Sequence, residues 1–210
     1  MKQLLAHDEL GCGLRLRHPI VCVLDSTGFA IAIALLVIYR PHPAVAVLGL
    51  GVMLQYVCSF LYHARPYNDK LCRLDMTAIY ILVGATYVPY WGTQLSPDDT
   101  FVRLTYIAVA TTLGAVSMWT GWLYRFTPLW YAGFAASGFT ISFNELQSWL
   151  PPVGLAGFWI GVVLYGTQQL IHGLQRPNPL PEFFGYREVQ HFILLGATTT
   201  HLAVAVAYLH

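Results

Sequence analysis

Two short stretches of the sequence carry the side chains best suited to chemistry. The first, "SFLYH", places Ser59 and His63 four residues apart, and the second, "REVQH", does the same for Arg187 and His191. On a helix, residues four apart lie on one face, about 6 Å apart along the axis. An imidazole can bind a metal ion or transfer a proton near neutral pH, and the carboxylate of Glu188 can assist either step. The two stretches therefore predict metal or acid–base chemistry, provided that the fold brings them together.

The composition is that of a membrane protein. Of the 210 residues, 56% are hydrophobic and 10% are charged, whereas charged residues make up about 25% of soluble globular domains. The net charge of +1 gives no reason to expect a nucleic acid as partner, and membrane lipids are the expected partners. The four cysteines form no Cys-x-x-Cys pair and are interpreted as small apolar side chains. We predict one integral membrane domain over residues 1–210.

Seven apolar stretches are long enough to cross a bilayer, for which a helix needs roughly 20 residues. They are separated by segments rich in proline and polar residues, such as "ARPYNDK" and "QRPNPLPEFFGY", which end one helix and delay the next. The stretches are Ile20–Tyr39, Ala44–Tyr62, Leu74–Trp91, Phe101–Leu123, Leu129–Leu150, Val153–Ile171 and Val189–Leu209. The predicted fold class is an all-α integral membrane bundle of seven transmembrane helices.

The basic residues predict the orientation, because loops on the cytoplasmic side carry an excess of lysine and arginine. The opposite set of loops would hold only Arg40 and Arg103. The cytoplasmic set would hold Lys2, Arg15, Arg17, Arg65, Lys70, Arg73, Arg125, Arg176 and Arg187. We therefore expect a multi-pass protein of the cell membrane with a cytoplasmic N-terminal segment at residues 1–19 and a C-terminus outside the cell.

With this topology, polar side chains from three helices should meet in one layer near the cytoplasmic surface. The second helix ends with Ser59 and His63, the third begins near Asp75, and the seventh begins with Glu188 and His191. Ionisable groups at membrane depth are costly, so each one is a candidate functional position. Each also has a plain structural interpretation. The histidines could hydrogen-bond headgroups or loops, and the helix dipole could favour an aspartate near the start of its helix. The serine could hydrogen-bond a carbonyl of its own helix, and the glutamate could balance the charge of the neighbouring arginine.

Four other ionisable residues receive no role from the sequence: Asp25, Glu145, His172 and His201. His201 lies ten residues beyond His191, about 15 Å along the same helix, so the two cannot share one ion. The sequence identifies no partner for Asp25 or Glu145. His18 lies outside the apolar stretches and is interpreted as an ordinary residue.

Three motifs resemble the hemolysin III family, which is grouped with the progestin/adipoQ receptors and, more distantly, the alkaline ceramidases. "SFLYH" at 59–63 resembles the Ser-x-x-x-His ending of the family's second helix, and "RLDMTAIYILVGATYVP" at 73–89 resembles its third helix, which carries an aspartate. "GVVLYGTQQLIHGLQRPNPLPEFFGYREVQHFILLGATTTH" at 161–201 follows the sixth helix, the proline loop and the seventh helix almost without gaps. The resemblance covers roughly residues 44–209; the N-terminal stretch matches poorly, and no residue role is carried onto it.

The resemblance implies a seven-helix bundle with a zinc ion near the cytoplasmic face. One histidine of the second helix and two histidines of the seventh, four residues apart, would hold the ion. His63 and His191 then correspond to metal ligands, while Ser59 and Asp75 correspond to the catalytic groups that support the zinc-bound water. The remaining ligand position falls on Arg187.

Arg187 departs from this pattern, because a guanidinium is always protonated and offers no lone pair to a metal. Three arrangements are open. Asp75 or Glu188 completes the zinc site while Arg187 extends to the headgroups. Alternatively, the Arg187 guanidinium takes the place of the ion and pairs with Asp75, or zinc binds weakly and conditionally.

Three functions compete, and the expected role is in membrane lipid homeostasis. The first is zinc-dependent hydrolysis of a lipid amide or ester from the inner leaflet, with Asp75 as the base and Ser59 orienting the water or the oxyanion. The second is a non-catalytic membrane regulator or sensor with a degenerate metal site, which a salt bridge between Arg187 and Asp75 would fit. The third, a pore-forming activity, ranks last because the helices are apolar all round.

Overall fold

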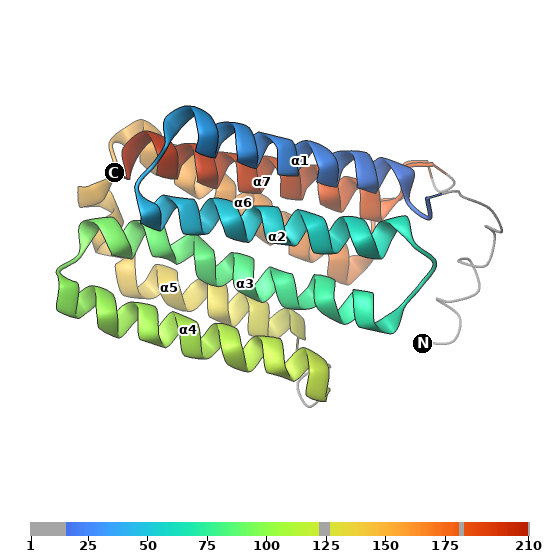
Figure 1. The fold of residues 1–210 in the computed structure, drawn as a ribbon, viewed down its shortest axis with the longest axis horizontal. Helices are drawn as coiled ribbons and strands as arrows, with labels where there is room; N and C mark the ends of the chain where they lie inside the picture. The colour runs from blue at the N-terminus through green and yellow to red at the C-terminus, as the bar shows by residue number, and fades with distance from the viewer. Residues whose placement is uncertain (1–15, 122–126, 181–182, 210) are drawn as a thin grey trace.

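The structure, a computed structural model, describes residues 16–121, 127–180 and 183–209, and these residues form seven helices (Figure 1). The helices are α1 (Pro19–Tyr39), α2 (Pro43–Ala64), α3 (Asp69–Gln94), α4 (Pro97–Thr120), α5 (Thr127–Trp149), α6 (Pro152–Leu174) and α7 (Tyr186–Tyr208). The described ranges contain no strand. Each predicted apolar stretch overlaps one of these helices, although the end of Phe101–Leu123 lies outside the described residues, and several helices begin earlier than the apolar pattern does.

The start of α3 shows why hydropathy alone misplaces a helix end. The helix begins at Asp69 rather than at Leu74. The side chain of Asn68 accepts hydrogen bonds from the backbone N–H groups of Lys70 and Leu71 at 2.9 and 3.2 Å. This N-cap satisfies donors that have no partner within the helix, so the polar residues after it can be helical.

Six helices, α1 to α4, α6 and α7, are long and apolar enough to cross a membrane by length and composition, within the part of the chain that the structure describes. The all-helical architecture and these six candidate spans agree with the predicted all-α membrane protein. A seventh crossing and the cytoplasmic position of the N-terminus stay predictions.

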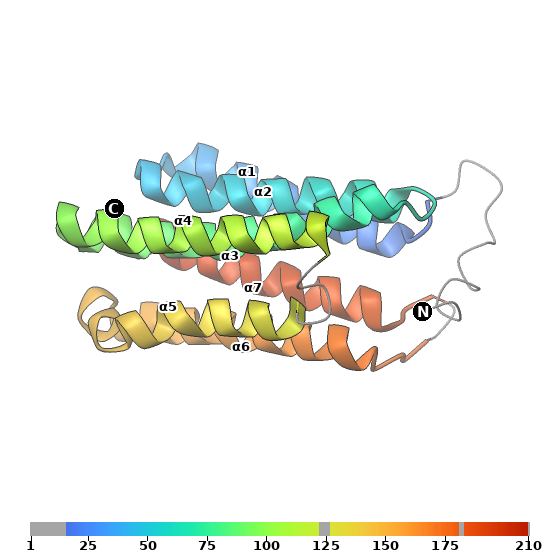
Figure 2. The same cartoon turned by 90° about the horizontal axis from the view of Figure 1, so that it is seen from below.

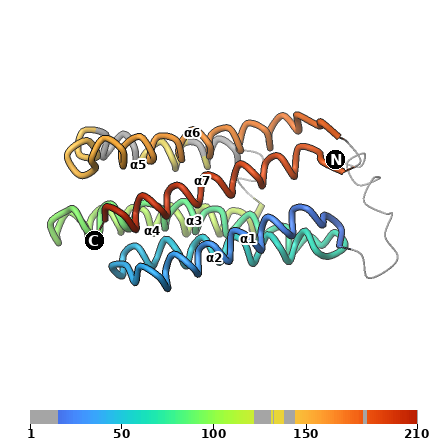
Figure 3. Tube along the Cα trace, turned by 90° about the horizontal axis from the view of Figure 1, so that it is seen from above, coloured from blue at the N-terminus to red at the C-terminus, as the bar shows by residue number. Residues whose placement is uncertain are grey.

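Helix α7 runs through the middle of the bundle. Figures 2 and 3 show α1 to α4 on one side of it and α5 and α6 on the other. The start of α1, the end of α2, the start of α3 and the start of α7 lie at the same end of the bundle (Figure 1), which we call the N-terminal end. The predicted site residues on three different helices therefore lie at one end of the molecule.

A close contact between α1 and α2 fixes the depth at which α2 meets α7. An ideal Cβ atom on Gly28 would lie 2.2 Å from Cζ of Tyr56, so only glycine leaves room for this ring against the backbone of α1. The hydroxyl of Tyr56 then forms a hydrogen bond with the Thr198 hydroxyl on α7 at 2.6 Å. Three helices are thus tied together in the interior of the bundle.

At the opposite end of the bundle, Glu145 on α5 has a partner that the sequence did not identify. Nη1 and Nη2 of Arg103 on α4 donate to Oε2 and Oε1 of Glu145 at 2.6 and 2.7 Å. The side chains of Arg103 and Glu145 are 19% and 36% exposed, so solvent screens the attraction between the two charges only in part. It is a bidentate link between two neighbouring helices.

We expect this link to contribute about 1 kcal/mol of coupling in a double-mutant cycle of Arg103→Met and Glu145→Gln. The free energy of unfolding of the purified protein in micelles is the quantity to measure. The matched control is the i,i+4 pair of Asp69 and Arg73, which is 64% and 35% exposed and should couple by less than about 0.5 kcal/mol. Equal coupling in the two cycles would contradict the prediction.

Candidate functional site

His63 and His191 lie against each other at the N-terminal end of the bundle. His63 is in the last turn of α2 and His191 is in the second turn of α7. Their ring centroids are 4.8 Å apart, with the ring planes at 85°. Both side chains are buried, and Nδ1 of His63 has no hydrogen-bond partner. The structure therefore brings together the two histidines that the sequence singled out on different helices.

Asp25 lies at the centre of the site, although the sequence offered no partner for it. Its carboxylate is fully buried on α1. Oδ2 accepts a hydrogen bond from Oγ of Ser59 at 2.7 Å, and Oδ1 lies 3.1 Å from Nδ1 of His191. A carboxylate that holds Nδ1 of an imidazole leaves Nε2 free to act as a base or as a ligand.

This geometry differs from that of an activated serine nucleophile. The Ser59 hydroxyl donates its proton to the carboxylate of Asp25, whereas a nucleophilic serine donates to the imidazole that will remove its proton. Ser59 therefore orients Asp25, and through it His191, in this arrangement.

Asp75 on α3 faces the same space as the two histidines. Its Oδ1 atom accepts a hydrogen bond from Nε2 of Gln55 at 3.0 Å. Asp75, His63 and His191 line a small cavity of about 140 Å³. We call Asp25, Ser59, His63, Asp75 and His191 the polar cluster.

His18 and Arg187 close the cluster on the side of the N-terminus. The backbone N–H of His18 donates to the carbonyl of His63 at 3.1 Å, and the two rings lie 5.2 Å apart. Nη1 of Arg187 lies 3.0 Å from Nε2 of His18. Since a guanidinium only donates, this nitrogen of His18 is the acceptor. The interpretation of His18 as an ordinary residue was therefore wrong.

Glu188 has a local role at the start of α7. Its Oε2 atom accepts a hydrogen bond from the backbone N–H of Gly185 at 2.8 Å, which caps the first turn of the helix. Its Oε1 atom is 3.9 Å from Nδ1 of His18. The carboxylate thus faces the cap and His18.

The polar cluster offers two nitrogen ligands to a metal ion, but not three protein ligands. Two imidazoles on one zinc ion, at zinc–nitrogen distances of about 2.0–2.1 Å, have ring centroids roughly 5 Å apart, close to the observed separation of His63 and His191. Among the described residues, however, no group of three His, Cys, Asp or Glu side chains is placed to hold a metal. The third position of the resemblance is Arg187, which donates to His18. The residues as they stand do not fit a resident three-ligand zinc site, and the metal and catalytic roles stay predictions.

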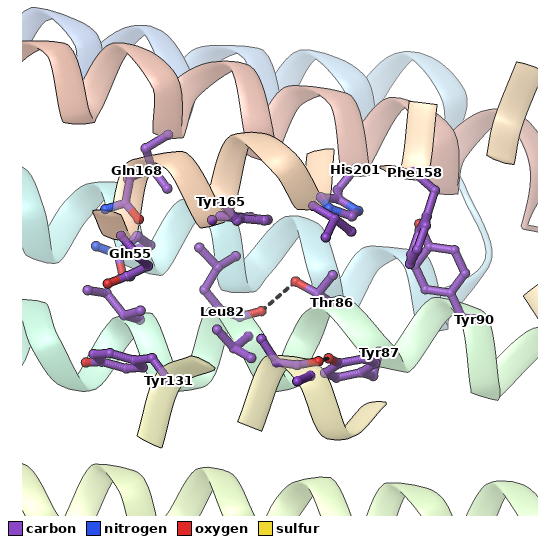
Figure 4. Close-up of a pocket in the computed structure, with 18 of the residues that line it drawn as sticks. Gln55, Leu82, Thr86, Tyr87, Tyr90, Tyr131, Phe158, Tyr165, Gln168 and His201 are labelled. Atoms are coloured by element: carbon purple, nitrogen blue, oxygen red, sulfur yellow. Dashed lines mark hydrogen bonds between the residues drawn. The ribbon is translucent and has the colours of Figure 1, made fainter. Parts of the chain in front are cut away.

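A larger cavity of about 390 Å³ begins at the polar cluster and continues between α3, α5, α6 and α7. Gln55, Asp75 and His191 lie at its end near the cluster, and Leu82 and Val162 line its middle. Figure 4 shows Gln55 and Gln168 at one end of this cavity and Tyr90, Phe158 and His201 at the other. His201 thus lines the same cavity as His191 but at its far end.

Two comparisons with known proteins bear on this chain. A family model described as haemolysin-III related matches residues 16–202. The match begins before α1, so the expectation that the resemblance starts near residue 44 was too narrow, and Asp25 lies inside the matched region. No curated protein matches the chain.

Proposed function

This chain belongs to the haemolysin-III-related family, and on that premise we propose that it binds a membrane lipid amide or ester and acts in membrane lipid homeostasis as a regulator or sensor. The observation that carries the proposal is the cavity of about 390 Å³, which has polar residues at one end and apolar walls along its length. Small-molecule sites in proteins are typically about 300–1,000 Å³ and combine mostly apolar walls with a few polar groups that fix orientation.

The chemistry of the cavity end near the polar cluster favours a neutral headgroup. Gln55 and Gln168 offer amide donors and acceptors there, and Asp75 offers a carboxylate. An amide or ester can accept from glutamine, and an amide can also donate to Asp75. A free carboxylate would instead be repelled by Asp75. The excess of arginine and lysine predicted for this side of the membrane favours a lipid from the cytoplasmic leaflet.

Filling the cavity tests the proposal. Gly166 on α6 is exposed and lines the cavity, and a Cβ atom built there meets nothing within 4 Å, so Gly166→Leu should add a leucine side chain at the cavity wall without steric conflict at its own backbone. We expect at least tenfold weaker binding of radiolabelled dodecanamide to the purified protein in nanodiscs.

The matched control is Gly173→Leu on the same helix. Gly173 is exposed, also has open space around its Cβ position, and does not line the cavity. This variant should bind dodecanamide as the wild type does. Unchanged binding by Gly166→Leu, or no binding of dodecanamide by the wild type, would refute the proposed function.

A second candidate function is hydrolysis of the same class of lipid with zinc as cofactor. The hydrogen bond between Asp25 and His191 favours it, because a carboxylate on the second ring nitrogen commonly orients a metal-binding histidine. Arg187 at the third ligand position argues against it. The Arg187→His variant tests whether the site can hold zinc. The proposed binding of lipid does not depend on the result of that test.

A further inference from the structure

We propose that the ligand of the large cavity carries a second polar group, a hydroxyl or a carbonyl, which Tyr90 and His201 bind at the far end of the cavity, with Tyr165 stacked on His201 toward the middle. This inference rests on the proposed function, because it names the class of lipid that the same cavity takes. It adds a second recognition point to a lipid amide or ester whose head lies near the polar cluster.

The side chains of Tyr90, Tyr165 and His201 form one connected group. The rings of Tyr165 and His201 are stacked with centroids 5.3 Å apart, and Phe158 lies between His201 and Tyr90, 5.4 and 5.2 Å from their centroids. All four residues line the cavity. Figure 4 shows Tyr90, Phe158 and His201 together at the end away from Gln55.

Each of the three polar residues has a buried polar atom without a hydrogen-bond partner in the protein. These atoms are the hydroxyl oxygens of Tyr90 and Tyr165 and the Nδ1 atom of His201. His201 and Tyr90 are 1% and 2% exposed, so neither side chain can turn to bulk solvent. A buried polar group left without a partner costs roughly 1–3 kcal/mol, and buried polar groups in proteins are nearly always hydrogen-bonded.

Other tyrosines on the same cavity show that the fold can satisfy a hydroxyl when no ligand is needed. The hydroxyl of Tyr131 donates to the carbonyl of Met76 at 2.7 Å, and that of Tyr87 donates to the carbonyl of Ala135. Phenylalanine would fill the space at Tyr90 and Tyr165 without the cost of a buried hydroxyl. A polar group of a ligand in the cavity would supply the partner that the Tyr90 hydroxyl lacks in the protein.

The separation of the two polar ends sets the length of the ligand. His191 at the near end and His201 at the far end are ten residues apart on α7, which is about 15 Å along the helix axis. An extended saturated chain of about twelve carbons spans the same distance. A hydroxyl at the end of such a chain can donate to His201 Nδ1 or accept from a tyrosine.

Binding of two matched lipids tests the inference. We expect the wild type in nanodiscs to bind 12-hydroxydodecanamide roughly five- to tenfold more tightly than dodecanamide, since a net hydrogen bond contributes about 0.5–1.5 kcal/mol.

The double variant Tyr90→Phe/Tyr165→Phe should reduce the preference for the terminal hydroxyl to about twofold or less, while dodecanamide binds at least as well as before. Because the Tyr90 hydroxyl has no partner in the protein, Tyr90→Phe alone should unfold at the same temperature as the wild type or a higher one, whereas Tyr165→Phe also removes an interaction with Thr86. The matched control is Tyr106→Phe on α4, which is 43% exposed, lies outside the cavity and should keep the full preference.

Three results would overturn the inference. Equal affinity of the wild type for dodecanamide and its 12-hydroxy derivative would show that the three polar atoms bind water rather than a lipid hydroxyl. A preference that persists in the double variant would show that other groups read the hydroxyl. Failure of the wild type to bind any of the lipids would refute the proposed function together with this inference.

Discussion

Replacement of Asp25 by leucine should lower the free energy of unfolding by about 2–5 kcal/mol. Asp25 accepts from Ser59 and faces Nδ1 of His191, and all three side chains are buried. Leucine has a similar volume but accepts no hydrogen bond, so two buried donors lose their acceptor at roughly 1–3 kcal/mol each. Thermal or denaturant unfolding of the purified protein in micelles measures the effect.

Two further variants separate the hydrogen bonds from the packing. Asp25→Asn keeps one acceptor oxygen and should lose less stability than Asp25→Leu. Adding Ser59→Ala to Asp25→Leu removes one of the two unsatisfied donors, so the double variant should recover about 1 kcal/mol. If Asp25→Leu had the same free energy of unfolding as the wild type, the polar cluster would not be what holds α1, α2 and α7 together.

Replacement of Arg187 by histidine should convert the polar cluster into a site that retains zinc. The new imidazole would lie one turn from His191 on the same face of α7, near His63, and the change removes a positive charge from beside the ion. Three nitrogens and one water complete the tetrahedral coordination of a catalytic zinc site. We expect purified Arg187→His to carry close to one zinc per chain and the wild type to carry much less.

The control is the double variant Arg187→His/His63→Ala, which should return the zinc content to the wild-type level. Equal, stoichiometric zinc in the wild type and in Arg187→His would show that another group already completes the site. Asp75 is then the stronger candidate, because Glu188 caps the first turn of α7. Absence of zinc from both proteins would identify the polar cluster as a set of hydrogen bonds between helices and would refute the second candidate function.

The positions of the helices follow largely from the sequence, because long apolar runs interrupted by proline have few alternatives in a membrane. The shared depth of the site also follows, by counting along the helices. His191 is five residues from the start of α7, Ser59 is five from the end of α2 and Asp25 is six from the start of α1, so all three lie about 8–9 Å from their helix ends. The layer predicted from the sequence included positions on the second, third and seventh helices only. Counting on the first helix as well would have placed Asp25 at the depth of the polar cluster.

Contacts that depend on the packing of helices could not be obtained in this way. His18 precedes α1, and only the packing of α1 against α2 and α7 places its ring between His63 and Arg187. Glu145 and Arg103 lie on helices whose relative rotation hydropathy does not determine, since both are apolar nearly all round. The far end of the cavity depends likewise on the rotation of α6, which turns Tyr165 toward His201.

The central position of α7 has a consequence for how the protein is made. The ribosome produces α7 after the helices that pack against it, α1, α2, α3 and α6, so Asp25 and Tyr56 enter the membrane before His191 and Thr198 exist to meet them. During that interval the nascent chain holds Asp25 without its contact to His191 and the Tyr56 hydroxyl without its contact to Thr198, which is costly in hydrocarbon. A chain interrupted before Tyr186 would keep this defect permanently. Such a fragment should be degraded rather than persist as a smaller six-helix protein.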